Sequence, residues 1–389
     1  MPRLLHLADV HLGARHQDMG SAAAAQRERQ MAAFRRAIDL ALAEKVDAVL
    51  ICGDLFDSNN QPRRSVENAA AELRRLAERH IRTVIIPGTH DAYDEGSIYR
   101  VFDLPALVGV DGAPDLVTLL TDERTTVSFA DLDMTVHGRV FRTKRAPQSP
   151  LAGFTPREAG AVTRWQVGMI HGALQIPGKV EQDDVLFTEA EIAASGLDYL
   201  ALGHWHSFLE GRAGSTAWAY AGAPEAVAVD QDGAGSVVLV NLDDASGKVT
   251  LEARPVGRTT HRRLDVDVAA IASQAELERR LGELADPDLV LETRLVGVLP
   301  DALDLNLDEV EQHLAGGFLR FRLRDHSVAA LPEAELPPAE TIPGAFVRDL
   351  EERIHQHERD GDADTAAELR EALRLGRLLL EQPERVVLV

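Results

Sequence analysis

The stretch "VDAVLICGDLFD" (residues 46–57) decides the fold class of this chain. Its short strand-like run at 47–52 passes directly into Gly53 and Asp54, a pattern typical of a buried strand that ends in a polar turn. Similar runs occur at 3–8 ("RLLHLA") and 83–87 ("TVIIP"), and helical patterns separate them at about 22–44 and 64–79. This alternation predicts an α/β fold built from βαβ units.

Closely spaced strand-like runs replace the alternation after about residue 116. They are "DLVTLL", "TTVSFA", "MTVHGRV", "QVGMIHG", "DYLALGH", "GSVVLVNL" and "KVTLEARPV". Consecutive strands of this kind predict a second sheet packed on the first, with helices on the outside. Residues 1–257 are therefore expected to form a four-layer α-β-β-α sandwich.

A smaller α+β domain is predicted at 258–330. It alternates strand-like runs ("RRLDVDV", "LVLETRLVGV", "FLRFRL") with helices at 273–284 and about 307–314. The first of these helices begins at a capping box formed by Ser273 and Glu276. The Pro- and Glu-rich stretch at 331–344 is interpreted as a linker.

Residues 345–389 are predicted to form a hairpin of two helices, with Asp364 as a possible cap of the second. Apolar side chains recur along one side of each helix, at Phe346, Leu350 and Ile354 and at Leu369, Leu373 and Leu380. The hairpin either packs on its own body or docks on a partner helix or coiled coil.

The composition limits the function classes. A formal charge of -22 over 389 residues argues against a protein that coats nucleic acid by bulk electrostatics, so a DNA substrate would require local basic residues, metal ions or a partner. No run approaches the ~18 to 20 apolar residues that span a bilayer, and the N-terminal residues lack a signal-peptide pattern, so we expect a cytoplasmic protein. The one cysteine, Cys52, permits no internal disulfide and no Cys-x-x-Cys metal site, and is expected to be a small core residue.

Five short polar motifs follow predicted strands, where ligands collect in α/β sheets. They are "DVH" (Asp9, His11), "GDLFD" (Asp54, Asp57), "GTHD" (Thr89, His90, Asp91), "HG" (His171) and "GHWH" (His204, His206). Each motif alone has a structural explanation, but the whole set is hard to explain as unrelated accidents. Mixed oxygen and imidazole ligands suit Mn, Fe, Zn or Co, and two such ions clamp a phosphoryl group and generate a hydroxide for in-line attack.

These motifs, in this order, resemble the calcineurin-like binuclear metallophosphoesterase superfamily over about the first 225 residues. Four stretches of the sequence resemble one branch of this superfamily, the DNA-repair exonuclease subunit of the SbcCD type. They are "LLHLADVHLG", "QRER" at 26–29, "VDAVLICGDLFD" followed by Pro62, and "YAGAPEAV" at 220–227. The resemblance implies a nuclease core, a capping domain, and a C-terminal helical segment that docks on the coiled coil of an SbcC-like ATPase. It also implies a homodimer, formed through core helices near the first long helix.

The resemblance also implies the roles of the site residues. A first metal ion would be bound by Asp9, His11, Asp54 and His206. Asp54 would bridge to a second ion, whose other ligands would be residue 89, His171 and His204, and both ions are expected to be Mn. His90 matches the family's catalytic histidine, which protonates the leaving oxygen or stabilises the transition state. Asp57 belongs to the same catalytic region, where it either orients His11 or His90 or caps the loop.

Thr89 departs from the family pattern, which has asparagine at this position. The threonine hydroxyl is neutral but reaches one atom less far than an asparagine amide oxygen. It could ligate the second metal directly, act through a bridging water, or leave the second site weakly filled. We expect two metals at saturating concentration, with the second bound more weakly.

Three functions are consistent with these observations. The first is a metal-dependent DNA nuclease subunit that acts with an SbcC-like ATPase, since the chain itself contains no Gly-x-x-x-x-Gly-Lys-Ser/Thr sequence for ATP hydrolysis. The second is a stand-alone nucleotide phosphodiesterase or phosphatase, which the negative charge also fits. The third is a non-catalytic scaffold subunit whose site has decayed at Thr89. The basic cluster at 139–145 either contacts a phosphate backbone or consists of solvated loop charges.

Overall fold

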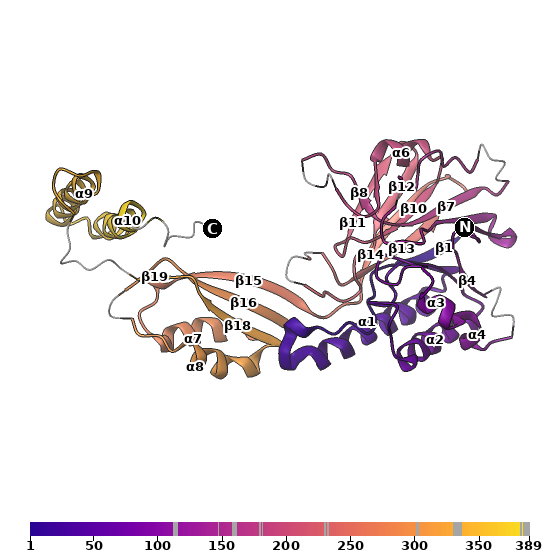
Figure 1. Cartoon of the computed structure of the whole chain (residues 1–389), viewed down its shortest axis with the longest axis horizontal. Helices are drawn as coiled ribbons and strands as arrows, with labels where there is room; N and C mark the ends of the chain where they lie inside the picture. Colours follow the sequence, from indigo (N-terminus) through magenta and orange to yellow (C-terminus); the bar gives the residue numbers. More distant parts are fainter. Residues whose placement is uncertain are drawn as a thin grey trace. The chain divides into compact units, whose positions relative to one another are not determined.

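The computed structural model describes the whole chain except residues 112–115, 147, 158–161, 179, 181, 229–230, 232, 301–302, 330–336, 382 and 384–389. The chain divides into two compact units, Met1–His261 and Arg262–Val389 (Figure 1). Among the described residues, none of the helices combines the length and the apolar character that crossing a membrane requires.

The first sheet of unit 1 has six strands in the order β14-β13-β1-β2-β3-β4. Strands β1 to β4 run parallel, and β13 and β14 are antiparallel additions at one edge. The strands are β1 (Arg3–Leu7), β2 (Ala48–Cys52), β3 (Arg82–Ile86), β4 (Val117–Leu119), β13 (Ser236–Leu242) and β14 (Val249–Pro255). Every residue of β2 is buried, because both faces of the sheet are covered, and this explains the continuous apolar run in its sequence.

The second sheet also has six strands, in the order β11-β12-β10-β7-β6-β5. The central strands β6, β7, β10 and β12 are parallel to their neighbours, and β5 and β11 are antiparallel edges. The strands are β5 (Thr126–Phe129), β6 (Met134–Arg139), β7 (Trp165–His171), β10 (Tyr199–Gly203), β11 (Leu209–Ala213) and β12 (Thr216–Tyr220). The short pair β8 (Ala173–Leu174) and β9 (Leu186–Phe187) lies outside this sheet.

Helices cover the outer faces of the two sheets, on opposite sides of unit 1 (Figure 1). The first sheet is covered by α1 (Ala23–Glu44), α2 (Arg63–Ala77), α3 (Ile98–Val101) and α4 (Leu104–Val108), and the second by α6 (Glu189–Ala194). Short 3₁₀ helices occur at η1 (Gln17–Ala22), which is kinked at Gly20, and at η2 (Ala130–Leu132).

Alternate residues of one strand explain the layering. In β2, Val49 and Ile51 pack with Phe34 of α1 in the outer core, whereas Leu50 packs with Met169 of β7 in the core between the sheets. Successive strand residues point to opposite faces, so one apolar run supplies two cores. The predicted four-layer α-β-β-α sandwich is confirmed, and Cys52 is a buried free thiol in the central core.

Unit 2 contains a three-stranded sheet in the order β15-β16-β18, with two helices that share its core. Its elements are β15 (Thr260–Asp267), η3 (Val268–Ala270), α7 (Gln274–Gly282), β16 (Leu289–Val296), β17 (Val298–Leu299), α8 (Leu307–Leu314), η4 (Ala315–Gly317), β18 (Arg320–Asp325) and β19 (Val328–Ala329). Ser273 caps α7 as predicted, because its hydroxyl accepts from the Glu276 N–H. The Glu276 carboxylate, however, accepts from the Ala272 N–H, one residue before the cap.

The C-terminal helices are α9 (Ile342–Arg359) and α10 (Ala363–Glu381), and they pack on each other. A Cβ on Gly376 would lie 2.2 Å from the Phe346 ring, so the glycine permits this close approach. The expected linker at 331–344 lies partly outside the described residues, and α9 begins inside it because a helix tolerates Pro343 in its first turn.

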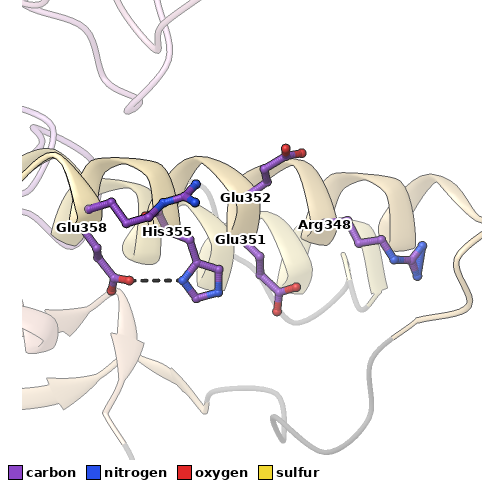
Figure 2. A pocket seen from close by; sticks show the side chains of 6 residues that line it. Arg348, Glu351, Glu352, His355 and Glu358 are labelled. Atoms are coloured by element: carbon purple, nitrogen blue, oxygen red, sulfur yellow. Dashed lines mark hydrogen bonds and ion pairs between the residues drawn. The ribbon is translucent and has the colours of Figure 1, made fainter.

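Two expectations for these helices are wrong. Asp364 lies inside α10, and Asp362 accepts from the Thr365 N–H instead, because the helix begins earlier than expected. Leu380 is exposed, whereas Leu378 is buried, because the buried side of α10 drifts from the four-residue spacing. Figure 2 shows the charged side of α9, where Arg348, Glu351, Glu352, His355 and Glu358 line an open depression.

Candidate metal centre

The five polar motifs meet because the parallel strands of both sheets end at one edge. The backbone continues the β1 and β2 pairing past the strand ends, where the N–H groups of Asp9 and His11 donate to the carbonyl groups of Gly53 and Asp54 at 3.1 and 2.9 Å. In the other sheet, β7 ends at His171, whose register partner is Gly203, immediately before His204. The strand ends thus deliver the polar side chains to one place.

Unusual backbone conformations bring these side chains inward. Asp9, His11 and Asp54 have φ values of 51°, 51° and 50°, and His204 has a φ of 103°. Residues other than glycine rarely adopt positive φ, and such conformations concentrate at functional sites.

Two glycines of the motifs leave room that any side chain would fill. A Cβ on Gly53 would lie 2.3 Å from His171 Nδ1, and a Cβ on Gly88 would lie 2.2 Å from Asp54 Oδ1. Glycine at these positions therefore allows the loops to approach the polar cluster.

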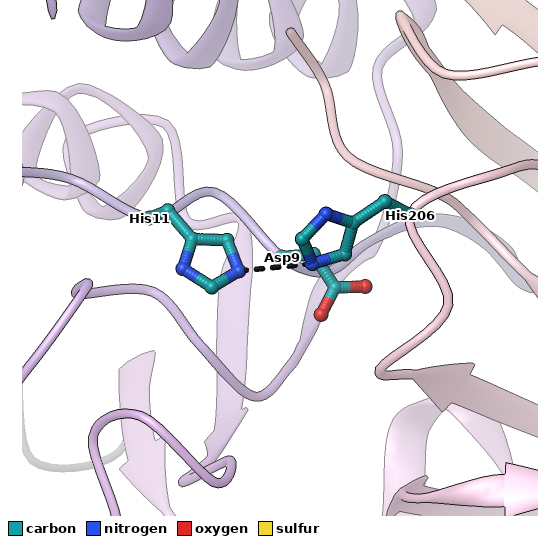
Figure 3. A group of neighbouring side chains, drawn as sticks. All are labelled: Asp9, His11 and His206. Carbon is teal, nitrogen blue, oxygen red and sulfur yellow. Dashed lines mark hydrogen bonds between the residues drawn. The ribbon is translucent and has the colours of Figure 1, made fainter. Parts of the chain in front are cut away.

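The first group of possible metal ligands consists of Asp9, His11 and His206 (Figure 3), each of which offers a ligand atom within 4.8 Å of the others. The Nε2 atoms of His11 and His206 are 3.1 Å apart. All three side chains are buried or half-buried.

The second group shares Asp9 and adds Asp54 and His171. The His171 Nδ1–H donates to the Cys52 carbonyl at 2.9 Å, and this bond leaves Nε2 facing Asp54 Oδ2 at 3.1 Å. His171 Nε2 is fully buried, and its polar neighbour is the Asp54 carboxylate. A buried imidazole nitrogen beside a carboxylate fits a divalent cation, so the residues present are compatible with the metal that the sequence predicts.

The opposite charges of His171 and Asp54 shift the pKa values of both side chains. Burial opposes the charged form of His171, but Asp54 and Asp9 outweigh it and raise the pKa of His171 to about 10. Burial also opposes ionisation of Asp54, but the adjacent His171 and His11 hold the pKa of this carboxyl well below its usual range. Without metal, the pair is therefore an imidazolium beside a carboxylate, and a metal ion would displace the proton.

A third group joins His11, Asp57 and His90. Asp57 Oδ1 lies 3.3 Å from His11 Nδ1, and this hydrogen bond lowers the pKa of the Asp57 carboxyl. The His90 Nδ1–H donates to the Asp57 carbonyl at 3.0 Å, and the His90 ring contacts the His11 ring edge to face. Among the possible roles of Asp57, the geometry thus favours orientation of His11. The side chain of His90 is 48% exposed and so is accessible to a substrate.

Thr89 lies beside the bridging position predicted for Asp54. Its hydroxyl is 3.5 Å from Asp54 Oδ2, and the N–H of the next residue, His90, donates to Asp54 Oδ1 at 2.7 Å. Position 89 therefore faces the carboxylate that links the two predicted metal sites.

Among the predicted His and Asp ligands, His204 lies outside these groups of described residues. Its ring packs edge to face on His171, with centroids 5.4 Å apart, and its Nε2 lies 3.1 Å from Asp183. Its backbone N–H donates to both carboxylate oxygens of Asp9, at 3.0 and 3.1 Å.

Asp91 has a structural role that its sequence position did not reveal. This fully buried carboxylate accepts from the N–H groups of Gly88, Asp54 and Phe56, at 2.7, 3.2 and 3.1 Å, and from the Tyr99 hydroxyl at 2.6 Å. Burial and the nearby Asp54 raise the pKa of Asp91, and these donors act in the opposite direction. Asp91 thereby holds the loops that follow β2 and β3 together.

Two further residues, Asp183 and Gln231, contact predicted ligands, although no sequence motif contains them. Gln231 Nε2 is 2.6 Å from His206 Nδ1, and its Oε1 accepts from the N–H groups of Val227 and Ala228. Both residues lie in loops without a recognisable motif, so no local signal could have identified them.

Two cavities of about 580 Å³ each adjoin the cluster. One is largely apolar and is lined by Val180, His204, Trp205, His206, Ser207, Phe208, Leu209 and Gln231. The other is polar and is lined by Gly13, Arg15, Asp57, Ser58, Asn60, Gln61 and Pro62.

Two of the four basic residues at 139–145 pair with acidic neighbours. Arg142 pairs with Asp122 and Glu123, and Arg145 pairs with Asp184. These ion pairs lower the positive charge that the cluster offers to a phosphate backbone.

The sandwich and its His/Asp cluster define a metallophosphoesterase. Residues 2–208 match the family described as "Calcineurin-like phosphoesterase", and the chain belongs to this family of phosphoester hydrolases.

Several curated relatives are similar over parts of the chain. "DNA double-strand break repair protein Mre11" of Aeropyrum pernix is 27% identical over 69% of this chain and 64% of its own length. "Uncharacterized metallophosphoesterase YhaO" of Bacillus subtilis is 26% identical over 70% of this chain and 65% of its own. The Mre11 protein of Sulfolobus acidocaldarius is 42% identical over 23% of this chain and 22% of its own. The chain thus matches less than two thirds of the length of each of these relatives.

Proposed function

We propose that this protein is a metal-dependent DNA nuclease subunit that hydrolyses phosphodiester bonds in DNA repair. The supporting observation is the pair of possible metal-binding groups that share Asp9 and lie at the ends of parallel strands from two sheets. The relatives named Mre11 give the proposal its substrate class.

In this proposal the chain holds two divalent ions, expected to be Mn, and each side chain has a defined task. Asp9, His11, Asp54 and His206 would hold the first ion, and Asp54, Thr89, His171 and His204 the second. When bound, such ions stabilise the charge of a phosphoryl group and lower the pKa of a coordinated water. Asp57 would orient His11 through the 3.3 Å contact with its Nδ1.

His90 would manage the proton of the leaving oxygen. Its Nδ1–H donates to the Asp57 carbonyl, so Nε2 is the nitrogen left available to a substrate. The ring is half exposed and lies against the predicted ligand His11. A histidine at this place can donate a proton or stabilise charge in the transition state.

The two adjoining cavities favour a nucleic-acid substrate over a small phosphomonoester. The apolar cavity contains Trp205 and Phe208, and aromatic side chains bind unstacked bases of single strands or ends. The polar cavity contains Arg15, which suits a neighbouring phosphate.

An SbcC-like coiled-coil ATPase is the proposed partner, because a chain of charge -22 grips DNA poorly by itself. The proposed docking segment is the α9 and α10 pair. Leu375, Leu379 and Leu380 of α10 are 38%, 36% and 41% exposed, which provides an apolar surface for a partner helix. A homodimer formed near α1 is part of the same proposal.

The proposal predicts Mn-dependent cleavage of labelled linear and hairpin DNA, with stronger activity when the candidate ATPase is added. The metal chelator EDTA should abolish the activity, and Mn should restore it. Turnover of small phosphodiesters without any DNA cleavage, alone or with the ATPase, would support the stand-alone phosphodiesterase instead. If the chain binds Mn but hydrolyses neither DNA nor small phosphodiesters, the result would support a non-catalytic scaffold subunit.

Replacing Thr89 with asparagine is expected to tighten binding of the weaker Mn ion by about tenfold, roughly 1.4 kcal/mol. The amide oxygen reaches one atom further than the hydroxyl, from a position that already faces Asp54 Oδ2. Calorimetric titration of the metal-free protein with Mn measures the change.

Thr89→Val is the matched control, since it removes the hydroxyl with little change of shape. Weaker binding in this variant would indicate that the natural hydroxyl contributes to the site. Identical Mn isotherms for Thr89→Asn and the natural chain would show that position 89 does not reach the metal.

A further inference from the structure

The contact between His204 and Asp183 is the starting observation. Both carboxylate oxygens of Asp183 lie 3.1 Å from His204 Nε2. The side chains of His204 and Asp183 are 24% and 23% exposed, so the contact lies at the surface beside the cluster. Neither the sequence motifs nor the family pattern assigns a role to Asp183.

This contact determines which nitrogen of His204 is free. An ionised carboxylate only accepts hydrogen bonds, so the proton of the neutral imidazole is held at Nε2. The lone pair then belongs to Nδ1. A metal ligand needs a lone pair, so only Nδ1 of His204 is suited to bind an ion.

Two other predicted metal ligands, His11 and His171, show the opposite arrangement. The Nδ1 atoms of His11 and His171 face Asp57 Oδ1 and the Cys52 carbonyl, and their Nε2 atoms face Asp54. His204 therefore differs from both of them in the ring nitrogen that its acceptor leaves free. Its φ of 103° and the bond from its N–H to Asp9 fix the backbone from which the ring projects.

Asp183 is itself held in place by its neighbours. Its Oδ1 accepts from the Asp184 N–H at 2.6 Å. Asp184 is anchored to the 145–146 segment, because its carboxylate pairs with Arg145 at 2.9 Å and its carbonyl accepts from the Ala146 N–H at 2.8 Å. The carboxylate of Asp183 is thus presented to His204 by an anchored loop.

We propose that Asp183 is a positioning residue that holds His204 in the tautomer and orientation that bind the second metal ion through Nδ1. This inference rests on the proposed two-metal centre. Partners of metal-bound histidines typically contribute 10-fold to 100-fold to metal affinity. With Thr89 as a poor ligand, the second site depends heavily on its histidines.

The test is calorimetric titration of the metal-free full-length protein with Mn, together with electron paramagnetic resonance of the loaded protein. Asp183→Ala is expected to weaken the weaker binding event by about 10-fold to 100-fold and to leave the stronger event unchanged. The spin-coupled signal of a Mn pair should give way to that of an isolated Mn ion. Asp183→Asn should restore most of the affinity, because an amide oxygen still accepts from Nε2.

Glu189→Ala is the matched control, since this exposed carboxylate in the first turn of α6 belongs to none of the possible metal-binding groups of described residues and should leave both isotherms unchanged. Equal isotherms for Asp183→Ala and the natural chain would overturn the proposal, as would equal weakening of both events in Asp183→Asn. A natural chain that binds one Mn ion would also overturn it. The test does not require activity, so a chain that binds two Mn ions but leaves DNA intact contradicts the proposed nuclease and not the role of Asp183.

Discussion

Replacing Asp54 with asparagine is expected to lower phosphodiester hydrolysis by about 10³-fold, roughly 4 kcal/mol of transition-state stabilisation. Asp54 belongs to the second possible metal-binding group, 3.1 Å from His171 Nε2, and it also lies 3.8 Å from His11 Nε2 of the first group. Asparagine has nearly the same size but lacks the negative charge that two cations would share. Steady-state hydrolysis of labelled single-stranded DNA and of a small phosphodiester, at saturating Mn, measures the loss.

Asp47→Asn is a suitable control for this variant. Asp47 precedes the same strand at its opposite end, where its carboxylate accepts from the Arg3 N–H at 2.8 Å, and it should leave hydrolysis unchanged. The Asp54→Asn protein should also bind both Mn ions more weakly, because the shared ligand has lost its charge. Full activity with two tightly bound ions in Asp54→Asn would contradict the bridging role.

Replacing Asp91 with alanine is expected to lower the free energy of unfolding by about 3 to 5 kcal/mol. The substitution leaves three buried N–H groups and the Tyr99 hydroxyl without their common acceptor. Unsatisfied buried donors carry their full desolvation cost. Denaturation by urea in the presence of EDTA measures the change without a contribution from bound metal.

Tyr99→Phe removes one of these four donors and leaves the carboxylate in place. It should cost less than Asp91→Ala, about 1.5 to 3 kcal/mol for a bond to a charged group. If Asp91→Ala unfolds within about 1 kcal/mol of the natural chain, Asp91 does not hold the two loops together. The order of the two variants therefore tests the network rather than the single side chain.

Much of the fold could be predicted, because the signals are local. The fully buried strand β2 is a continuous apolar run, and α1 occupies nearly the range that its periodicity predicted. The C-terminal helices were less predictable. Their spacing selected Leu380, which is 41% exposed, whereas Leu378 is the buried leucine of this turn.

The predicted site residues meet for a reason that the sequence contains. Asp9, His11, Asp54, His171 and His206 follow parallel strands, and such strands end at a common edge. Asp57 and His90 join them through His11, and the Thr89 hydroxyl faces Asp54. The assignment of individual ions to these residues stays a prediction.

The sequence by itself determined the α/β core, the small α+β domain and the types of side chain available for metal chemistry, because hydrophobic periodicity and short motifs are local properties. Only the tertiary structure decided which groups support those side chains. Asp183 contacts a histidine 21 positions away, and the Asp91 carboxylate joins loops separated by 37 positions. Such contacts depend on how loops of irregular conformation approach one another, and neither periodicity nor composition encodes that approach.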